Sequence, residues 1–115
     1  MSDCIFCKII AGEIPSAKRY EDDDILAFDD LYPQAPVHFL VVPKKHIESA
    51  ADITADNSAL IAKCFEVIAH LAKEEKLGDG FRVITNSGAN AGQTVGHLHF
   101  HVLAGRKLGP KLCAE

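Results

Sequence analysis

Residues 97–103 alternate histidine with apolar residues, and this alternation constrains the fold more than any other feature of the sequence. Successive side chains of a β-strand point to opposite faces, so a strand here places three imidazoles on one face and Leu98, Phe100 and Val102 in a core. Half of the six histidines of the chain fall within this segment. One histidine alone would be explained by a polar surface, but three in strict alternation predict a functional site.

Two kinds of chemistry suit this row of histidines. A metal such as zinc takes imidazole ligands, but same-face neighbours on one strand lie roughly 7 Å apart, so further ligands must come from elsewhere. A neutral imidazole can also attack phosphorus when its second nitrogen is held by a hydrogen-bond acceptor. His99 lies between His97 and His101, which can orient it and bind phosphoryl oxygens or a leaving group. The row therefore predicts a catalytic site for the phosphorus of a small molecule.

The segment before the histidines, 87–94, supports a phosphate site. It contains two glycines, amide side chains and hydroxyls, which can surround an anionic phosphoryl group with hydrogen-bond donors. As an isolated segment it would be an ordinary turn, and its position directly before the histidines gives it weight.

The rest of the chain consists of short apolar runs separated by turn residues. We expect a short helix over 4–11, in which Ile5, Phe6 and Ile9 share an apolar side. Extended, β-branched runs predict strands at 17–21, 24–29, 37–42, 81–86 and 94–105. Strands that follow one another, with one long helix inserted, favour an α+β fold with an antiparallel sheet.

The long helix is expected over 56–76. Thr54 is the predicted N-cap, and Gly78 is predicted to end the helix. Apolar residues recur at steps of three and four and predict one buried stripe: Leu60, Ile61, Cys64, Phe65, Ile68 and Leu71.

Length and composition exclude several classes of protein. The 115 residues fit a single domain, 1–115, and the net charge of −4 without a basic stripe argues against a nucleic-acid partner. No apolar run is long enough to cross a membrane, and residues 1–4 lack the features of a signal peptide. We therefore expect a cytoplasmic protein without a membrane partner, whose four cysteines are reduced thiols or metal ligands.

Cys4 and Cys7 form a C-x-x-C pair. Such a pair is compatible with a zinc site, a redox dithiol or two ordinary cysteines on a short helix. A thioredoxin-like arrangement is disfavoured because no strand precedes the pair. Cys64 belongs to the helix stripe and is expected to be buried, whereas Cys113 lies in the C-terminal tail and has no assigned role.

Residues 97–103 resemble the signature of the histidine-triad (HIT) family, and 92–95 resemble the motif that precedes it in the Hint branch, the purine nucleoside phosphoramidases. Further segments similar to that branch are 6–10, 13–15, 26–28, 33–36 and 38–46. The resemblance implies an α+β, HIT-like fold with a five-stranded antiparallel sheet. It also implies a homodimer that joins two sheets into one.

The implied reaction cleaves the P–N bond of a purine nucleoside phosphoramidate and releases a nucleoside monophosphate and an amine. By resemblance, His99 is the nucleophile that forms a nucleotidyl-histidine intermediate, and His101 lies near the leaving group. His97 is the orienting histidine and His38 the fourth histidine of the site. Nucleotide-binding residues carried over in the same way are Asp30 for the ribose, Phe6, Ile9, Phe28 and Leu31 for the base, and Asn86, Gly92, Gln93 and Thr94 for the phosphate.

Some bacterial members of the family bind zinc through a cysteine pair and two histidines. The matching residues here are Cys4, Cys7, His46 and His97, a closed set that implies a structural metal, with none required for the chemistry. Zinc on His97 would also fix its ring beside His99.

The sequence departs from the best-known members of the branch in three places. It contains no tryptophan, and its tail, 106–115, differs where preference for the amine is set. Gly96 stands where a larger residue is common. Alternative functions are hydrolysis of dinucleoside polyphosphates, nucleotidyl transfer, a non-catalytic nucleotide-binding regulatory role, and a purely structural zinc protein.

Overall fold

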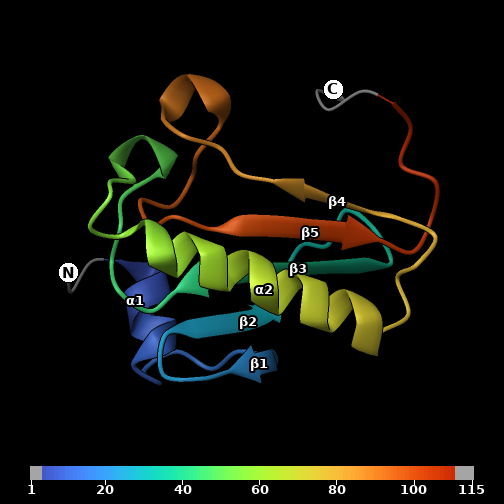
Figure 1. The fold of residues 1–115 in the computed structure, drawn as a ribbon, viewed down its shortest axis with the longest axis horizontal. Helices are drawn as coiled ribbons and strands as arrows, with labels where there is room; N and C mark the ends of the chain where they lie inside the picture. The colour runs from blue at the N-terminus through green and yellow to red at the C-terminus, as the bar shows by residue number, and fades with distance from the viewer. Residues whose placement is uncertain (1–3, 111–115) are drawn as a thin grey trace.

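The apolar runs form one antiparallel sheet with a helix on each face, as the computed structural model of residues 4–110 shows (Figure 1). The five strands are arranged in the order β1-β2-β3-β5-β4. Their bounds are β1 (Lys18–Glu21), β2 (Ile25–Asp29), β3 (Val37–Pro43), β4 (Phe81–Ile84) and β5 (Phe100–Ala104). The helices are α1 (Ile5–Ile10) and α2 (Ser58–Glu74), with short 3-10 turns at Ala50–Asp52 and Ala89–Ala91. The predicted α+β class and five antiparallel strands are confirmed.

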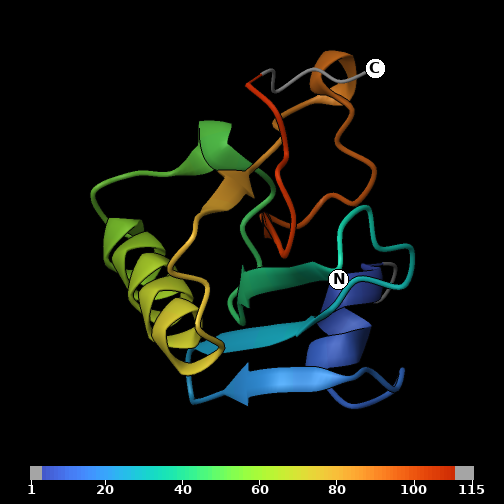
Figure 2. The ribbon, with the colours of Figure 1, turned by 90° about the vertical axis from the view of Figure 1, so that its right-hand side faces the viewer.

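Alternation along the central strands divides the core into two layers. In β2, Ile25 and Ala27 pack in the layer that contains α2, whereas Leu26 and Phe28 pack in the layer that contains α1. Figure 2 shows the two helices on opposite sides of the sheet. Because both faces are covered, the central strands are apolar at nearly every position rather than at every second one.

The last strand is shorter than predicted. β5 begins at Phe100 rather than at residue 94, and its register sets Phe100 opposite Val41 of β3. Continuing this register would set Pro43 opposite Leu98, and proline has no N–H to donate to a ladder. Leu98 instead donates its N–H to the carbonyl of Ile47 at 2.6 Å. The histidine alternation persists through this irregular segment.

Helix α2 is shorter than predicted at both ends, since it spans Ser58–Glu74 rather than 56–76. Its N-cap is Asn57 rather than Thr54, whose carbonyl accepts the N–H groups of Asn57 and Ser58. Beyond its end, Lys76 has a left-handed φ of 60°, so the helix ends before Gly78. The stripe is also rotated, since Phe65 is 47% exposed while Val67 is buried.

The exposed fractions of Ile5 and Cys64 test two further predictions for the helices. Ile5 is 45% exposed, so the apolar side of α1 consists of Phe6 and Ile9 only. Cys64 is fully buried, as predicted, and burial raises the pKa of its thiol to about 12. Cys113 lies outside the described residues. No helix within residues 4–110 is long and apolar enough to cross a membrane.

Candidate active site and metal centre

Four histidines gather on the face of the sheet that carries α1. His97, His99 and His38 are at most 6% exposed, and His101 is partly buried. The ring of His99 lies between those of Phe6 and His101, with centroids 5.0 Å from each. The predicted grouping of the triad with His38 is thus present in the structure.

His99 is held as a neutral ring with one free nitrogen. Its Nδ1 lies 2.7 Å from the backbone carbonyl oxygen of His97. A carbonyl only accepts, so Nδ1 carries the proton and Nε2 keeps its lone pair. Burial lowers the pKa of His99, although the bond to the carbonyl opposes the shift. The result is an imidazole prepared to act as a nucleophile through Nε2.

His38 and His101 form a second hydrogen-bonded unit. The backbone N–H of Gln34 donates to His38 Nδ1 at 3.0 Å, which places the proton of neutral His38 on Nε2. That nitrogen lies 3.0 Å from His101 Nδ1, which therefore accepts. The remaining proton of His101 lies on Nε2, so His101 can act as a hydrogen-bond donor toward a ligand.

Asp30 adds a carboxylate to this unit. Its Oδ2 lies 3.4 Å from His38 Nε2 and 3.9 Å from His101 Nδ1, and its Oδ1 accepts the N–H of Tyr32. Neighbouring Asp29 is instead bound by Arg19. The two adjacent acids therefore differ in role, and Asp30 belongs to the site.

Asp30, His38 and His101 are close enough to hold a metal ion. The nitrogen of His38 that faces the other two residues is protonated, however, and a protonated nitrogen cannot bind a metal. A ligand nitrogen must be unprotonated, and His38 Nε2 loses its proton only if the ring becomes an anion, because Nδ1 already accepts from Gln34. This cluster is suited to proton and phosphate contacts rather than to a cation.

A separate cluster contains the predicted zinc ligands. One ligand atom from each of Cys4, Cys7, His46 and His97 lies within 4.8 Å of the others. His97 Nδ1 is 3.5 Å from Cys4 Sγ, and His46 Nδ1 is 3.3 Å from Cys7 Sγ. Burial and the neighbouring Cys4 raise the pKa of the Cys7 thiol to about 11, so a cation is needed to draw off its proton.

Both histidines of this cluster have the tautomer that a metal requires. His97 Nε2 donates to the carbonyl of Pro43 at 2.8 Å, and His46 Nε2 faces Glu48 Oε1 at 3.4 Å. Both partners only accept, so each ring keeps its Nδ1 lone pair directed at the thiols. The donor set, two thiols and two imidazoles, fits a tetrahedral zinc ion.

Known proteins match this chain along nearly its whole length. Residues 3–112 match the family model described as "Scavenger mRNA decapping enzyme C-term binding". A HIT-like protein of Synechococcus elongatus is 48% identical over 106 residues, which are 92% of this chain and 93% of that protein. The chain belongs to the histidine-triad (HIT) family.

Solved HIT structures have the same fold. A HIT family hydrolase from Clostridium thermocellum gives a TM-score of 0.95 at 41% identity and covers 98% of this chain and 99% of that one. A histidine triad nucleotide-binding protein from Candida albicans gives 0.84 at 36% identity, over 98% and 85% of the two chains. The predicted HIT-like fold is therefore confirmed.

The residues predicted to bind the base are mostly core residues in this HIT domain. Phe6, Ile9 and Phe28 are at most 8% exposed and pack together, with Phe6 edge-on to Phe28 at 5.5 Å. Leu31 is 86% exposed and lies outside this cluster. Base binding stays a prediction for all four residues.

The residues predicted to bind phosphate lie on the loop after β4. Asn86 is partly buried, and Gly92 and Thr94 are exposed. The amide of Gln93 is already engaged, since Oε1 accepts the Gly88 N–H and Nε2 donates to the carbonyls of Glu48 and Val95. In this structure Gln93 holds the loop in place, and its contact with phosphate stays a prediction.

Most of the hydrogen-bond partners that orient the histidines could not be recognised in the sequence. The acceptors on His97 and His99 and the donor to His38 are backbone groups, which any residue type supplies. Glu48 could have been found from its position two residues after a predicted zinc ligand, where a carboxylate can reach the imidazole.

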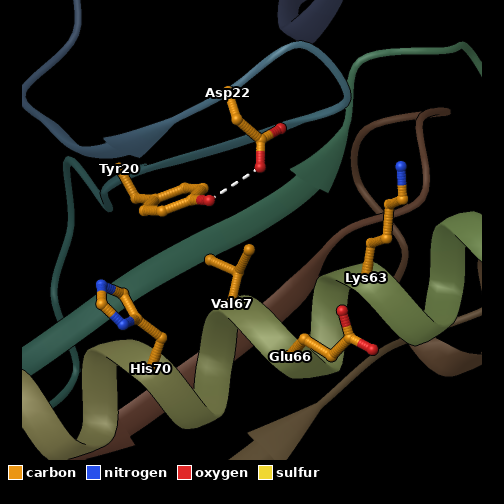
Figure 3. A pocket seen from close by; sticks show the side chains of 6 residues that line it. All are labelled: Tyr20, Asp22, Lys63, Glu66, Val67 and His70. Atoms are coloured by element: carbon orange, nitrogen blue, oxygen red, sulfur yellow. Dashed lines mark hydrogen bonds between the residues drawn. The ribbon is translucent and has the colours of Figure 1, made fainter.

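The other face of the sheet carries a hollow of about 340 Å³ between β1 and α2, which Figure 3 shows from close by. Four of its side chains already have partners: Tyr20 donates to Asp22, Lys63 pairs with Asp24, and His70 lies near Glu74. We assign it no part in the chemistry of the histidines.

The buried histidines make stability depend on pH. Burial, together with His99 and His38, lowers the pKa of His101 from 6.5 to about 4. The unfolded chain therefore binds a proton between these values that the folded chain does not, so the free energy of unfolding falls as the pH falls from about 6.5 to about 4.

Chemical denaturation across this pH range measures the effect. The variant His101→Asn should show a shallower decline, and His70→Asn, a change at an exposed histidine on α2, should follow the wild type. An equally steep decline in His101→Asn would contradict the assignment.

Proposed function

We propose that the protein is a hydrolase of the Hint type that cleaves the P–N bond of purine nucleoside phosphoramidates. The observation that carries the proposal is the hydrogen bond from His99 Nδ1 to the His97 carbonyl, which leaves Nε2 free to attack phosphorus. The names of two similar proteins, a hydrolase and a nucleotide-binding protein, agree with the reaction class.

The first step forms a bond between His99 Nε2 and phosphorus and breaks the P–N bond of the substrate. The departing nitrogen takes a proton from solvent and accepts a hydrogen bond from the Nε2–H of His101, which His38 fixes through Nδ1. The nucleotide is then carried on His99, whose Nδ1–H stays on the His97 carbonyl and stabilises the positive charge of the ring.

Water completes the reaction. It attacks phosphorus, the bond from phosphorus to His99 breaks, and the water gives up one proton to solvent. The net reaction adds one water molecule and yields a nucleoside monophosphate and an amine. Among the described residues, the Asp30 oxygens have one backbone hydrogen bond, from Tyr32, and the histidine contacts, so Asp30 retains lone pairs for the two ribose hydroxyls.

A second reaction is supported by the family model, whose description names a decapping enzyme. The same nucleophile could act on a P–O–P bond, with a nucleotide as the leaving group. A third reading is a nucleotide-binding protein without turnover. All three use the same site. The two reactions differ in the group that leaves phosphorus, and the third reading involves no reaction.

Turnover of a fluorogenic adenosine phosphoramidate tests the function. We expect the wild type to release the amine and His99→Ala to lose at least 10³-fold in kcat, because its nucleophile is missing, while AMP still binds. The matched control His70→Ala removes an exposed histidine from α2 and should keep full activity.

Binding of AMP without turnover of the phosphoramidate would reject this reaction. Dinucleoside polyphosphates, including a cap-like dinucleoside triphosphate, would then separate P–O–P cleavage from a binding role. Near-normal turnover by His99→Ala would reject His99 as the nucleophile.

We also propose that Cys4, Cys7, His46 and His97 hold a structural zinc ion. When bound, zinc supplies no reacting group and fixes the ring of His97. That residue carries the carbonyl that orients His99, so the metal centre and the nucleophile share one residue.

Metal analysis of protein purified without chelator tests the zinc site. We expect about one zinc per chain in the wild type and in Cys64→Ser, whose buried thiol lies outside the cluster. Cys7→Ser should lose most of the metal. Clearly less than one zinc per chain in the wild type would contradict the proposal.

Finally, we propose a homodimer formed through the edge strand β4. In the described sheet, β4 is paired on one side only, and Phe81 at its start is 41% exposed. An unpaired edge is a template for pairing with another strand, and a second copy would extend the sheet.

Sedimentation equilibrium tests the dimer. The wild type should have about twice the chain mass of 12.5 kDa. Phe81→Asp should shift the equilibrium toward the monomer, whereas Ile5→Asp, at a similarly exposed residue of α1, should not. A monomeric wild type at micromolar concentration would refute the proposal.

A further inference from the structure

Glu48 is the one acidic side chain among the described residues that contacts a predicted zinc ligand. Its Oε1 lies 3.4 Å from His46 Nε2, while His46 Nδ1 faces Cys7 Sγ at 3.3 Å. The carboxylate, the imidazole and the metal-binding thiol are therefore arranged in series. Carboxylates in this position orient metal-bound histidines and make the ring a stronger donor.

Gly96 provides the room for this carboxylate. A Cβ at residue 96 would collide with Glu48 Oε2 and lie 3.2 Å from the carboxyl carbon. The φ of Gly96 is outside the left-handed region, so the backbone itself accepts other residues here. The absence of a side chain is needed for space and not for backbone conformation.

Two hydrogen bonds fix the backbones of the two segments to one another. Gln93 Nε2 donates to the Glu48 carbonyl at 2.8 Å, and the Leu98 N–H donates to the Ile47 carbonyl at 2.6 Å. Residue 96 therefore stays beside residue 48. The Glu48 side chain itself is 66% exposed, so displacing it leaves the core intact.

The two histidines of the cluster are oriented by different kinds of acceptor. His97 uses the Pro43 carbonyl at 2.8 Å, a backbone group that no substitution removes. His46 uses the carboxylate of Glu48, a side chain that can be exchanged. Mutagenesis can therefore change the orientation of His46 without changing a ligand.

We propose that Glu48 is a positioning residue of the metal centre, and that Gly96 is required because it admits the Glu48 carboxylate to His46. The inference rests on the zinc site proposed above. It assigns a role to two residues that contact neither the metal nor the reacting phosphorus.

Zinc affinity measured by competition with a chromophoric chelator tests the proposal. Glu48→Ala should bind zinc roughly 10- to 100-fold more weakly, the range for loss of such a partner. Glu48→Gln should lose less, because its amide oxygen still accepts from His46. The control Glu66→Ala, at an exposed position on α2, should bind as the wild type does.

Gly96→Ala separates this role from a simple charge effect. Its methyl group should displace the carboxylate and weaken zinc as much as Glu48→Ala does, and the double variant should be no weaker than either single one. The Co²⁺-substituted protein gives a second readout, since a reoriented His46 changes the visible absorption of the tetrahedral ion.

The outcomes distinguish failure of the metal centre from failure of the roles given to Glu48 and Gly96. If the wild type binds no zinc, the metal centre itself is wrong. If it binds zinc and Glu48→Ala binds equally well, the role of Glu48 is overturned. If Gly96→Ala weakens binding equally when Glu48 is already alanine, the role of Gly96 is overturned.

Discussion

The site depends on three hydrogen-bonding groups of His97. Its carbonyl accepts from His99, its Nε2 donates to Pro43, and its Nδ1 faces two thiols. Since the ring is fully buried, none of these groups can exchange its partner for water. The residue thereby connects helix α1, the end of β3 and His99. A local change in any of the three reaches the others through one side chain.

Much of this arrangement followed from the sequence because it rests on side-chain alternation. Period-two placement of His97, His99 and His101 survives even where the segment leaves the ladder, since Leu98 and Phe100 must still enter the core. The grouping of the C-x-x-C pair with two histidines was also predictable, because clustered thiols and imidazoles are the ligands that a zinc ion prefers. The element types were predicted well, and their ends less well.

What the sequence did not predict depends on backbone groups or on tertiary packing. The rotation of the α2 stripe, which buries Val67 and exposes Phe65, depends on the angle at which the helix crosses the sheet. The end of the β5 ladder depends on Pro43, which lies far away in sequence. The protonation pattern depends on the Gln34 N–H and two carbonyls, which are present in every residue and so leave no pattern to detect.

The contact between Gln34 and His38 has a consequence for the loop between β2 and β3. This loop is braced from the far end of β5, where Arg106 donates to the Gln34 carbonyl and Gly105 leaves no room for a side chain beside Pro36. If the loop moved outward, His38 Nδ1 would lose its donor and the ring could adopt either tautomer. The proton positions on His38 and His101 thus depend on the position of a surface loop, which the segment after β5 contacts.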